Sequence, residues 1–328
     1  MKNLVELPVL FLIFLRNSSK QKKFLKQTIS DAIIESKKQN DGSLDADDYK
    51  KIQLYGYAVP AMLGEAYCVL RNQKMTKSER LSITFLGSIT GLFDDMFDKK
   101  VLTEEYIKNM IVKPSFLVGN NSNEKLFLTL YNNALEITQN KAVLIKKALA
   151  VFEAQISSRK QKQPEIDLSE IEEITFQKGG SSMLLYRSTL NNKIDDPEKS
   201  MIYLLGGIGQ LENDIFDIFK DYKEGIKTLA TTMHKTSSLR EKYLALMADV
   251  FNSVEKTNFP TGAKKKFRRI ISLVMSRGLV CLDCIEKNEK TTQNQFHLEK
   301  YERKDLICDM ESLGSFLKLI HYSAKYNF

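Results

Sequence analysis

Two short acidic segments carry the residues best suited to chemistry. The first is Ile89-Thr-Gly-Leu-Phe-Asp94-Asp95-Met-Phe-Asp98, in which Asp94 and Asp98 are four residues apart. On a helix these two carboxylates lie on one face, where like charges repel. The apolar residues on both sides make solvation a weak remedy, whereas a divalent cation would remove the conflict. Asp94, Asp95 and Asp98 are therefore candidate metal ligands.

The second acidic segment follows roughly 120 residues later and has the same character. Asn213, Asp217 and Asp221 are spaced i, i+4, i+8, so they form one oxygen-bearing stripe on a helix. Amide and carboxylate oxygens suit magnesium better than zinc or copper. Either motif alone is short enough to be a solvated patch or a set of helix-end carboxylates. Two such motifs on separate apolar helices indicate metal ions that are held by both motifs and bridge them to a bound diphosphate.

A glycine pair interrupts a third helical stretch, Phe176-Gln-Lys178-Gly179-Gly180. Glycine inside a helix costs about 1 kcal/mol relative to alanine. One interpretation is a plain turn between two helices. The other is a broken helix whose carbonyls point into a cavity, with Lys178 reaching a phosphate.

The elements that carry these residues are predicted to be helices. Apolar residues recur at helical spacing almost everywhere, and strand-like alternation is nearly absent. We expect an all-α fold, a single-domain bundle of about ten or more antiparallel helices that spans residues 1–328 around a central cavity. The predicted helix starts are three capping boxes and one capped proline: Thr76 to Glu79, Ser169 to Glu172, Ser238 to Glu241, and Asp196-Pro197.

Composition limits the class of protein. Of 328 residues, 43% are hydrophobic and 27% charged, which is a globular rather than a disordered mix. The net charge of +8 fits a phosphorylated substrate, an anionic membrane or a nucleic acid. No zinc-ligand spacing or RNA-binding signature accompanies it, so no nucleic-acid partner is expected.

The cysteines and the N-terminal segment indicate the cellular compartment in which the protein is expected. Cys281 and Cys284 would share one helical face as small core residues, and nothing suggests a disulfide framework, so we expect a cytoplasmic protein. The apolar run from Leu7 to Leu15 is too short to span a bilayer, and no cleavage site follows it. Residues 1–18 are expected to pack on the domain, with shallow membrane contact as the alternative.

Taken together, these residues resemble the class I isoprenoid synthases, which comprise prenyl diphosphate synthases and class I terpene synthases. The resemblance covers roughly Gly56 to Thr228 and rests on the order and spacing of the motifs. It implies the isoprenoid synthase fold, a prenyl diphosphate substrate and three Mg²⁺ ions. The outer aspartates of the first motif, together with Asn213, Asp217 and Asp221, are the implied ligands.

Departures from the family pattern favour one branch of it. Asn213 is the terpene-synthase choice, whereas Asp217 and Asp221 follow the elongating synthases. Elongating synthases grip isopentenyl diphosphate with an upstream basic stretch, where this chain has residues 55–60 without a cation, and with an arginine pair, where it has Lys99-Lys100. Because a second diphosphate needs basic partners, we expect one substrate and the chemistry of a terpene cyclase or related lyase.

The resemblance also implies roles around the substrate. Lys178, Arg187 and Lys220 would add positive charge against the leaving diphosphate. Ile89 and Thr90 stand where bulk limits chain length in the family, so a substrate of fifteen carbons or longer is favoured. The expected cavity residues, some of which offer cation–π support, are Ile89, Thr90, Phe93, Phe97, Gly179, Gly180, Tyr186 and Phe216.

Two alternatives remain open at this point. One is a prenyltransferase of the same fold, either chain-elongating or head-to-head condensing, which needs a second substrate. The other is a non-catalytic helical protein that binds lipid, membrane or nucleic acid, whose function would survive replacement of Asp94 and Asn213 by alanine. A homodimer is a further expectation.

Overall fold

The computed structural model describes residues 2–98 and 102–326, and the side chains within 15–97 and 102–326. Every regular element in these ranges is helical and none is a strand, which confirms the predicted all-α class. The chain divides into two compact units, and each is described by itself. The N-terminal unit is Val5–Gln155 with Leu185–Lys193, and the C-terminal unit is Ile156–Leu184 and Ile194–Phe328 with Met1–Leu4. The single-domain organisation stays a prediction.

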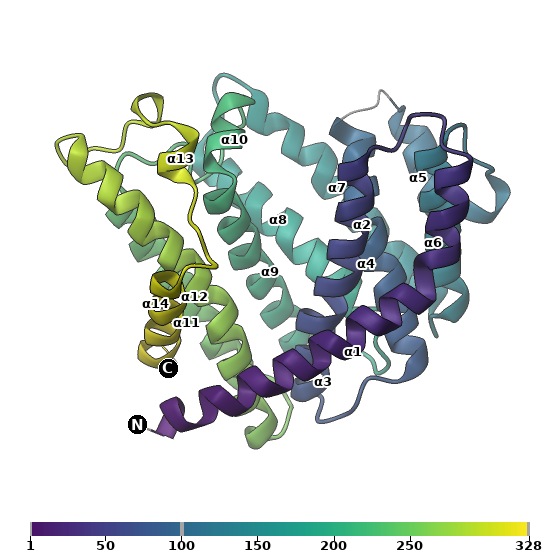
Figure 1. The fold of residues 1–328 in the computed structure, drawn as a ribbon, viewed down its shortest axis with the longest axis horizontal. Helices are drawn as coiled ribbons and strands as arrows, with labels where there is room; N and C mark the ends of the chain where they lie inside the picture. Colours follow the sequence, from purple (N-terminus) through teal and green to yellow (C-terminus); the bar gives the residue numbers. More distant parts are fainter. Residues whose placement is uncertain (1, 99–101, 327–328) are drawn as a thin grey trace. The chain divides into compact units, whose positions relative to one another are not determined.

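The N-terminal unit holds the purple-to-blue helices of Figure 1. They are α1 (Lys2–Lys38), α2 (Ala46–Ala58), the π-helical turn η1 (Val59–Gly64), α3 (Glu65–Leu70), α4 (Lys77–Asp98), α5 (Glu104–Val112), the 3₁₀ turn η2 (Pro114–Phe116), α6 (Ser122–Ile137) and most of α7 (Lys141–Ser158). Helix α4 packs against both α2 and α6 and carries the first acidic motif. The apolar run 7–15 lies within α1. The packing prediction concerns residues 1–18, and the side chains of 1–14 lie outside the described residues, whereas Ser18 is buried.

The C-terminal unit holds the teal-to-yellow helices. They are the 3₁₀ turn η3 (Arg159–Lys162), α8 (Leu168–Arg187, whose last three residues belong to the other unit), α9 (Asp196–Phe216), α10 (Ile218–Lys223), α11 (Thr236–Glu255), α12 (Thr261–Thr291), η4 (Leu298–Lys300), α13 (Arg303–Leu306) and α14 (Leu313–Lys325). Helices α9, α11 and α12 pack against one another, and α14 packs on α12. The second acidic motif lies at the junction of α9 and α10.

The capping box predicted at the start of α4 is confirmed. The Thr76 backbone N–H donates to Glu79 Oε2 at 2.7 Å, and the Glu79 N–H donates to Thr76 Oγ1 at 3.2 Å. Each side chain therefore satisfies a backbone donor that the first turn leaves unpaired.

The other predicted starts are wrong by one to three residues. Helices α8 and α11 begin before Ser169 and Ser238, which therefore lie inside their first turns. At α11 a distant residue does the capping, because Glu289 Oε2 of α12 accepts from the Thr236 N–H at 2.8 Å. At α9 the cap is Asp195, which accepts from the Glu198 N–H at 2.9 Å. Asp196 is then the first helical residue.

Helix α4 lies close to α2 through a glycine contact. A Cβ placed on Gly87 would be 2.7 Å from the Tyr55 carbonyl oxygen, so any side chain at this position would force the two backbones apart. The contact brings the α2 side chains beside the face of α4 that leads to the first acidic motif.

The helix break predicted at the glycine pair is absent, and so is the alternative turn, because α8 is continuous from Leu168 to Arg187. A Cβ on Gly179 would be 1.9 Å from the Gly206 carbonyl oxygen of α9, and one on Gly206 would be 2.3 Å from the Gly179 oxygen. The glycines therefore let two helix backbones touch. Within α8, the Ser182 hydroxyl donates to the Lys178 carbonyl of the preceding turn at 2.8 Å.

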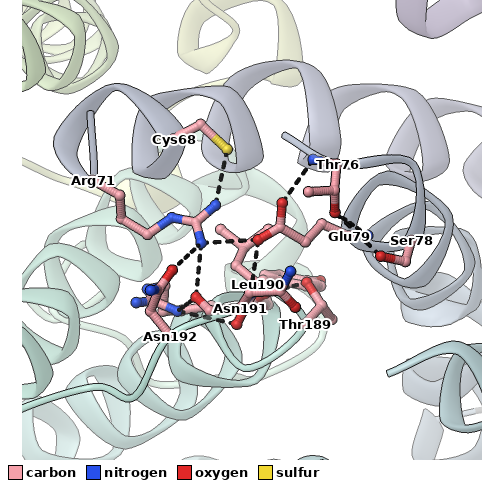
Figure 2. A network of polar contacts seen from close by, with 11 residues as sticks. Cys68, Arg71, Thr76, Ser78, Glu79, Thr189, Leu190, Asn191 and Asn192 are labelled. Atoms are coloured by element: carbon pink, nitrogen blue, oxygen red, sulfur yellow. Dashed lines mark hydrogen bonds and ion pairs between the residues drawn. The ribbon is translucent and has the colours of Figure 1, made fainter. Parts of the chain in front are cut away.

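A buried ion pair joins the start of α4 to the segment that follows α8, within the N-terminal unit (Figure 2). Arg71 NH1 lies 2.9 Å from Glu79 Oε1 and donates to the Asn191 carbonyl at 2.7 Å. Glu79 Oε1 also accepts from the Asn191 N–H at 2.7 Å. Both side chains of the pair are 2% exposed. Charges buried this deeply are stable only while every partner is in place.

Replacing Glu79 with Gln is expected to lower the free energy of unfolding by about 3 kcal/mol, because Arg71 would keep a buried charge without its counter-ion. Urea unfolding followed by circular dichroism measures this. Glu136→Gln is the matched control, since Glu136 is exposed on α6 of the same unit. Equal stability of the two variants would contradict the assignment.

The stability difference between the wild type and Glu79→Gln should depend on pH. Burial opposes the charge on Glu79, but hydrogen bonds from Arg71, Thr76 and Asn191 outweigh it and lower the pKa of Glu79 below its ordinary value of 4.5. A lowered carboxyl pKa contributes stability above the unfolded pKa, and this is lost as pH falls through the folded pKa. Unfolding curves between pH 7 and pH 3 should therefore converge toward the acid end. A constant gap would contradict this.

The crossing of α8 and α9 gives a second prediction. Gly179→Ala should destabilise the protein by about 3 kcal/mol, because its Cβ meets backbone that cannot move aside. Gly209→Ala on α9 is the control, since its Cβ would meet only the Met183 Cε at 3.4 Å, an ordinary contact. That variant should unfold at the same urea concentration as the wild type or slightly higher. Equal effects of the two substitutions would rule out a backbone contact.

Candidate functional site

The first acidic motif lies near the end of α4, and its described carboxylates have different surroundings. Asp94 is half-buried and accepts a hydrogen bond of 2.6 Å from Gln155 Nε2 of α7. Asp95 is 4% exposed and pairs with Lys51 Nζ of α2 at 3.4 Å. The side chain of Asp98 lies outside the described residues. The buried, lysine-paired Asp95 is the less suited of the two described aspartates to a metal.

Aromatic rings flank these carboxylates on α4. The Phe93 ring centroid lies 5.1 Å from that of Phe97 and 5.9 Å from that of Phe127 on α6. Phe97 in turn lies 5.9 Å from Phe152 of α7. Phe93 and Phe97 remain half-buried, whereas Phe127 is fully buried. The exposed part of this aromatic cluster therefore consists of the two residues predicted to line a cavity.

Two other predicted cavity residues are brought together beside the same motif. The Thr90 and Tyr186 hydroxyl oxygens are 2.7 Å apart, and Thr90 Oγ1 also lies 3.2 Å from the Leu86 carbonyl. Burial is the main cause that raises the pKa of Tyr186, and the negative charge of Asp94 raises it further. Tyr186 is therefore a neutral phenol beside the acidic motif. Ile89 is 6% exposed within the same helix.

The second acidic motif keeps its stripe across the end of α9. The helix is interrupted at Asp217, whose ψ is 10°, yet its N–H still donates to the Asn213 carbonyl at 2.9 Å. The Asp221 N–H donates to the Asp217 carbonyl at 2.9 Å, so the i, i+4 register continues into α10. The Asn213 amide lies 3.5 Å from Asp217 Oδ2. The three side chains named by the sequence therefore remain one turn apart in succession.

A buried carboxylate that was not among the predicted ligands stands behind this stripe. Asp214 is 4% exposed, and it accepts hydrogen bonds from Gln210 Nε2 at 2.8 Å and Thr175 Oγ1 at 3.5 Å. Burial raises the pKa of Asp214 to about 6, against the effects of Gln210, Lys178 and Thr175. The negative charge of Asp214 in turn raises the pKa of Asp221, the carboxylate of the stripe in α10.

Asp221 is the more deeply buried of the two aspartates in the stripe. It is 9% exposed, and burial, together with the charges of Asp214 and Asp217, raises the pKa of Asp221 to about 7. Lys220 and Lys178 act in the opposite direction. Negative charge thus outweighs positive charge at this end of α9, which is the environment that favours binding of a cation.

The three predicted cations have different positions. Lys178 of α8 is half-buried, and its charge acts on both Asp214 and Asp221. Lys220 is exposed beside the stripe. Arg187 is 1% exposed, and its NH1 lies 3.4 and 3.5 Å from the carbonyls of Leu190 and Asn191. Arg187 therefore holds the segment after α8, and its role toward a diphosphate stays a prediction.

Phe216, the last predicted cavity residue, lies under a cation from α12. The Arg277 guanidinium is 5.1 Å from the Phe216 ring centroid, and Arg277 Nε lies 3.4 Å from Glu212 Oε1. Burial raises the pKa of Glu212 to about 7, against the effects of Arg277 and of a hydrogen bond with Tyr243. The cation–π contact and the ion pair fix Arg277 above the helix that carries Asn213.

Each unit thus assembles one part of the predicted site. The N-terminal unit gathers Asp94, Thr90, Tyr186 and the two phenylalanines, and the C-terminal unit gathers the Asn213 stripe with Lys178 and Lys220. Gly179 and Gly180 serve the α8–α9 crossing instead. The sequence analysis missed Lys51, Gln155, Thr175 and the roles of Asp214 and Glu212, because their partners lie on other helices and leave no local spacing signal.

No family model matches the chain, and no curated protein matches it significantly. No described helix combines the length and the apolar character needed to cross a membrane. Among the described side chains, no three carboxyl, imidazole or thiol groups come together as a metal site.

Proposed function

We propose that this protein is a magnesium-dependent class I terpene synthase, which ionises a prenyl diphosphate to a carbocation with loss of diphosphate. The observation that carries the proposal is the stripe of Asn213, Asp217 and Asp221, whose register continues through the end of α9 with Lys178 and Lys220 beside it. A second oxygen-bearing motif on α4 supports it. The proposal requires that both motifs act on the same diphosphate.

The donor set fits magnesium. Asn213 is exposed, and Asp217 and Asp94 are half-buried, so hard oxygens are accessible on both motifs. Mg²⁺ is usually held by one or two carboxylates together with substrate phosphates rather than by a cage of protein ligands. Two accessible oxygens from each motif, completed by a diphosphate, would suffice. Asp94, Asn213 and Asp217 would hold the ions, with Asp221 as a further ligand.

The remaining residues would act on the substrate itself. Bound Mg²⁺ would act as a Lewis acid that stabilises the departing diphosphate. Lys178 and Lys220 would place positive charge where the leaving group gains negative charge in the transition state. The half-buried rings of Phe93 and Phe97 would offer cation–π support to the allyl cation, worth about 0.5–2 kcal/mol each, whereas the Phe216 ring already contacts Arg277. The phenol of Tyr186 would lie beside the prenyl chain of the substrate. Because it is neutral, it would not act as a base toward the carbocation.

Two features favour a cyclase over a prenyltransferase within this proposal. Tyr55 and its neighbours, where elongating synthases carry basic residues for a second diphosphate, lie in the α2–η1 segment that packs against α4. Two lysines lie on that side, and both already have a partner: Lys51 is paired with Asp95, and Lys22 Nζ lies 5.2 Å from the Tyr57 ring centroid. Ile89 and Thr90 precede the first motif, which favours a substrate of fifteen carbons or longer.

Gas chromatography of reaction products tests the proposal. Incubation of the full chain with Mg²⁺ and ten-, fifteen- or twenty-carbon diphosphates should give a hydrocarbon or alcohol from one of the two longer substrates without isopentenyl diphosphate. EDTA should abolish the product, and excess Mg²⁺ should restore it. Product only in the presence of isopentenyl diphosphate would make the protein a prenyltransferase, and turnover of the ten-carbon substrate alone would contradict the chain-length assignment.

Variants of the stripe separate catalysis from folding. Asn213→Ala and Asp217→Asn should each lower kcat at least about 100-fold, because charge stabilisation of the leaving group is lost. Asn252→Ala and Glu241→Gln are matched controls, since both residues are exposed on α11 of the same unit. Unchanged product formation by the stripe variants, with all four proteins folded by circular dichroism, would contradict the proposed role of the motif.

A further inference from the structure

Three of the four cysteines gather where α12 meets the segment before α14. Cys284 Sγ of α12 lies 3.3 Å from Cys308 Sγ, although the two residues are 24 positions apart in the sequence. Cys281, one turn earlier on α12, also reaches Cys308 with its thiol. Cys281 is 2% exposed, whereas Cys284 and Cys308 are half-buried. The pair within bonding reach is thus also the pair that a small reagent can reach.

The thiol pair lies at one end of a contact that holds the C-terminal helix. Further along α14, Lys318 Nζ and the Tyr322 hydroxyl both contact Asp283 of α12, at 2.6 and 2.7 Å. Ser323 meets Ser272 of α12 at 3.4 Å between the hydroxyl oxygens. Ser323 is the one buried side chain of α14, and Leu313 and Leu317 are 73% and 60% exposed. Polar contacts with α12 therefore hold α14 in place, and burial of apolar side chains contributes little.

We propose that Cys284 and Cys308 form a reversible disulfide that fixes the segment before α14 to α12. The oxidant is a low-molecular-weight disulfide such as oxidised glutathione. One protein thiolate attacks it and releases one reduced glutathione, and the second protein thiolate then displaces the other, so that two protons leave the protein thiols and two glutathione thiols form. The cross-link closes a loop in the unfolded chain and therefore stabilises the folded C-terminal unit.

The environment sets the speed of this reaction. Contact with Cys308 and burial raise the pKa of Cys284, and Lys318 and Lys287 act in the opposite direction. The Cys281 thiol and burial raise the pKa of Cys308 to about 11, against the effects of hydrogen bonds with Cys284 and Ser315. Because the thiolate is the nucleophile, the disulfide should form slowly at pH 7 and faster at pH 9.

Peptide mapping of the reduced full chain after treatment with oxidised glutathione tests the proposal. Free thiols are blocked with N-ethylmaleimide, and tryptic peptides are analysed without reduction. Residues 278–287, with N-ethylmaleimide on Cys281, and residues 305–318 should appear as one linked species, lighter by two hydrogens than the sum of these two peptides, and dithiothreitol should separate them. Glutathione attached to Cys284 or Cys308 without a linked species, or a link between two chains, would overturn the proposal.

Variants identify the sulfurs, because trypsin leaves Cys281 and Cys284 on one peptide. Cys284→Ser and Cys308→Ser should each abolish the link, whereas Cys281→Ser and Cys68→Ser should keep it. A link that survives in Cys284→Ser would overturn the assignment. The oxidised wild type should also melt about 5 °C higher than the reduced protein. Cys308→Ser treated in the same way should show no shift, and an equal shift in that variant would contradict a cross-link.

Discussion

The contact between α8 and α9 is the constraint on which the C-terminal site depends. Gly179 and Gly206 place backbone against backbone, with no room for a Cβ on either helix. This close approach brings Lys178, the residue before the glycine pair, near Asp214 and Asp221. With larger residues at the crossing, the helices would separate by the thickness of a side chain. Lys178 would then lie farther from the two carboxylates and offset less of their negative charge.

Electrostatics at the end of α9 follows from that arrangement. Asn213, Asp217 and Asp221 stay in helical register, and the buried Asp214 stands behind them. Burial and repulsion between carboxylates disfavour the charged forms of Asp214 and Asp221, and two lysines compensate only in part. The first motif differs, because Asp95 is already neutralised by Lys51 and Asp94 is held by Gln155. The residues that share an Asp-Asp pair in the sequence thus have separate roles.

Much of this fold could be predicted from local patterns. Helical periodicity gave the all-α class, and the Thr76–Glu79 pair gave the start of α4, because a capping box is contained in four residues. The i, i+4, i+8 spacing likewise survived as a stripe. At α9, Asp195 and Asp196 are both competent caps one position apart, and sequence alone does not decide between them.

The features that the sequence did not reveal depend on contacts between separate helices. The glycine pair reads locally as a breaker, and only the matching glycines of α9 turn it into a crossing of continuous helices. The contacts of Arg187 with the carbonyls that follow α8 likewise could not be read from its charge, and its role toward a diphosphate stays a prediction. The Cys284–Cys308 contact joins residues on separate elements, which no spacing rule connects.

The central claim is that the motif on α4 and the stripe on α9 and α10 bind one metal–diphosphate cluster. Anomalous diffraction from crystals grown with Mn²⁺ and inorganic diphosphate tests it most directly. The account predicts manganese peaks within coordination distance of both Asp94 and Asp217, with diphosphate oxygens between them. Peaks at only one motif, or the two aspartates on separate outer surfaces with no diphosphate between them, would contradict it.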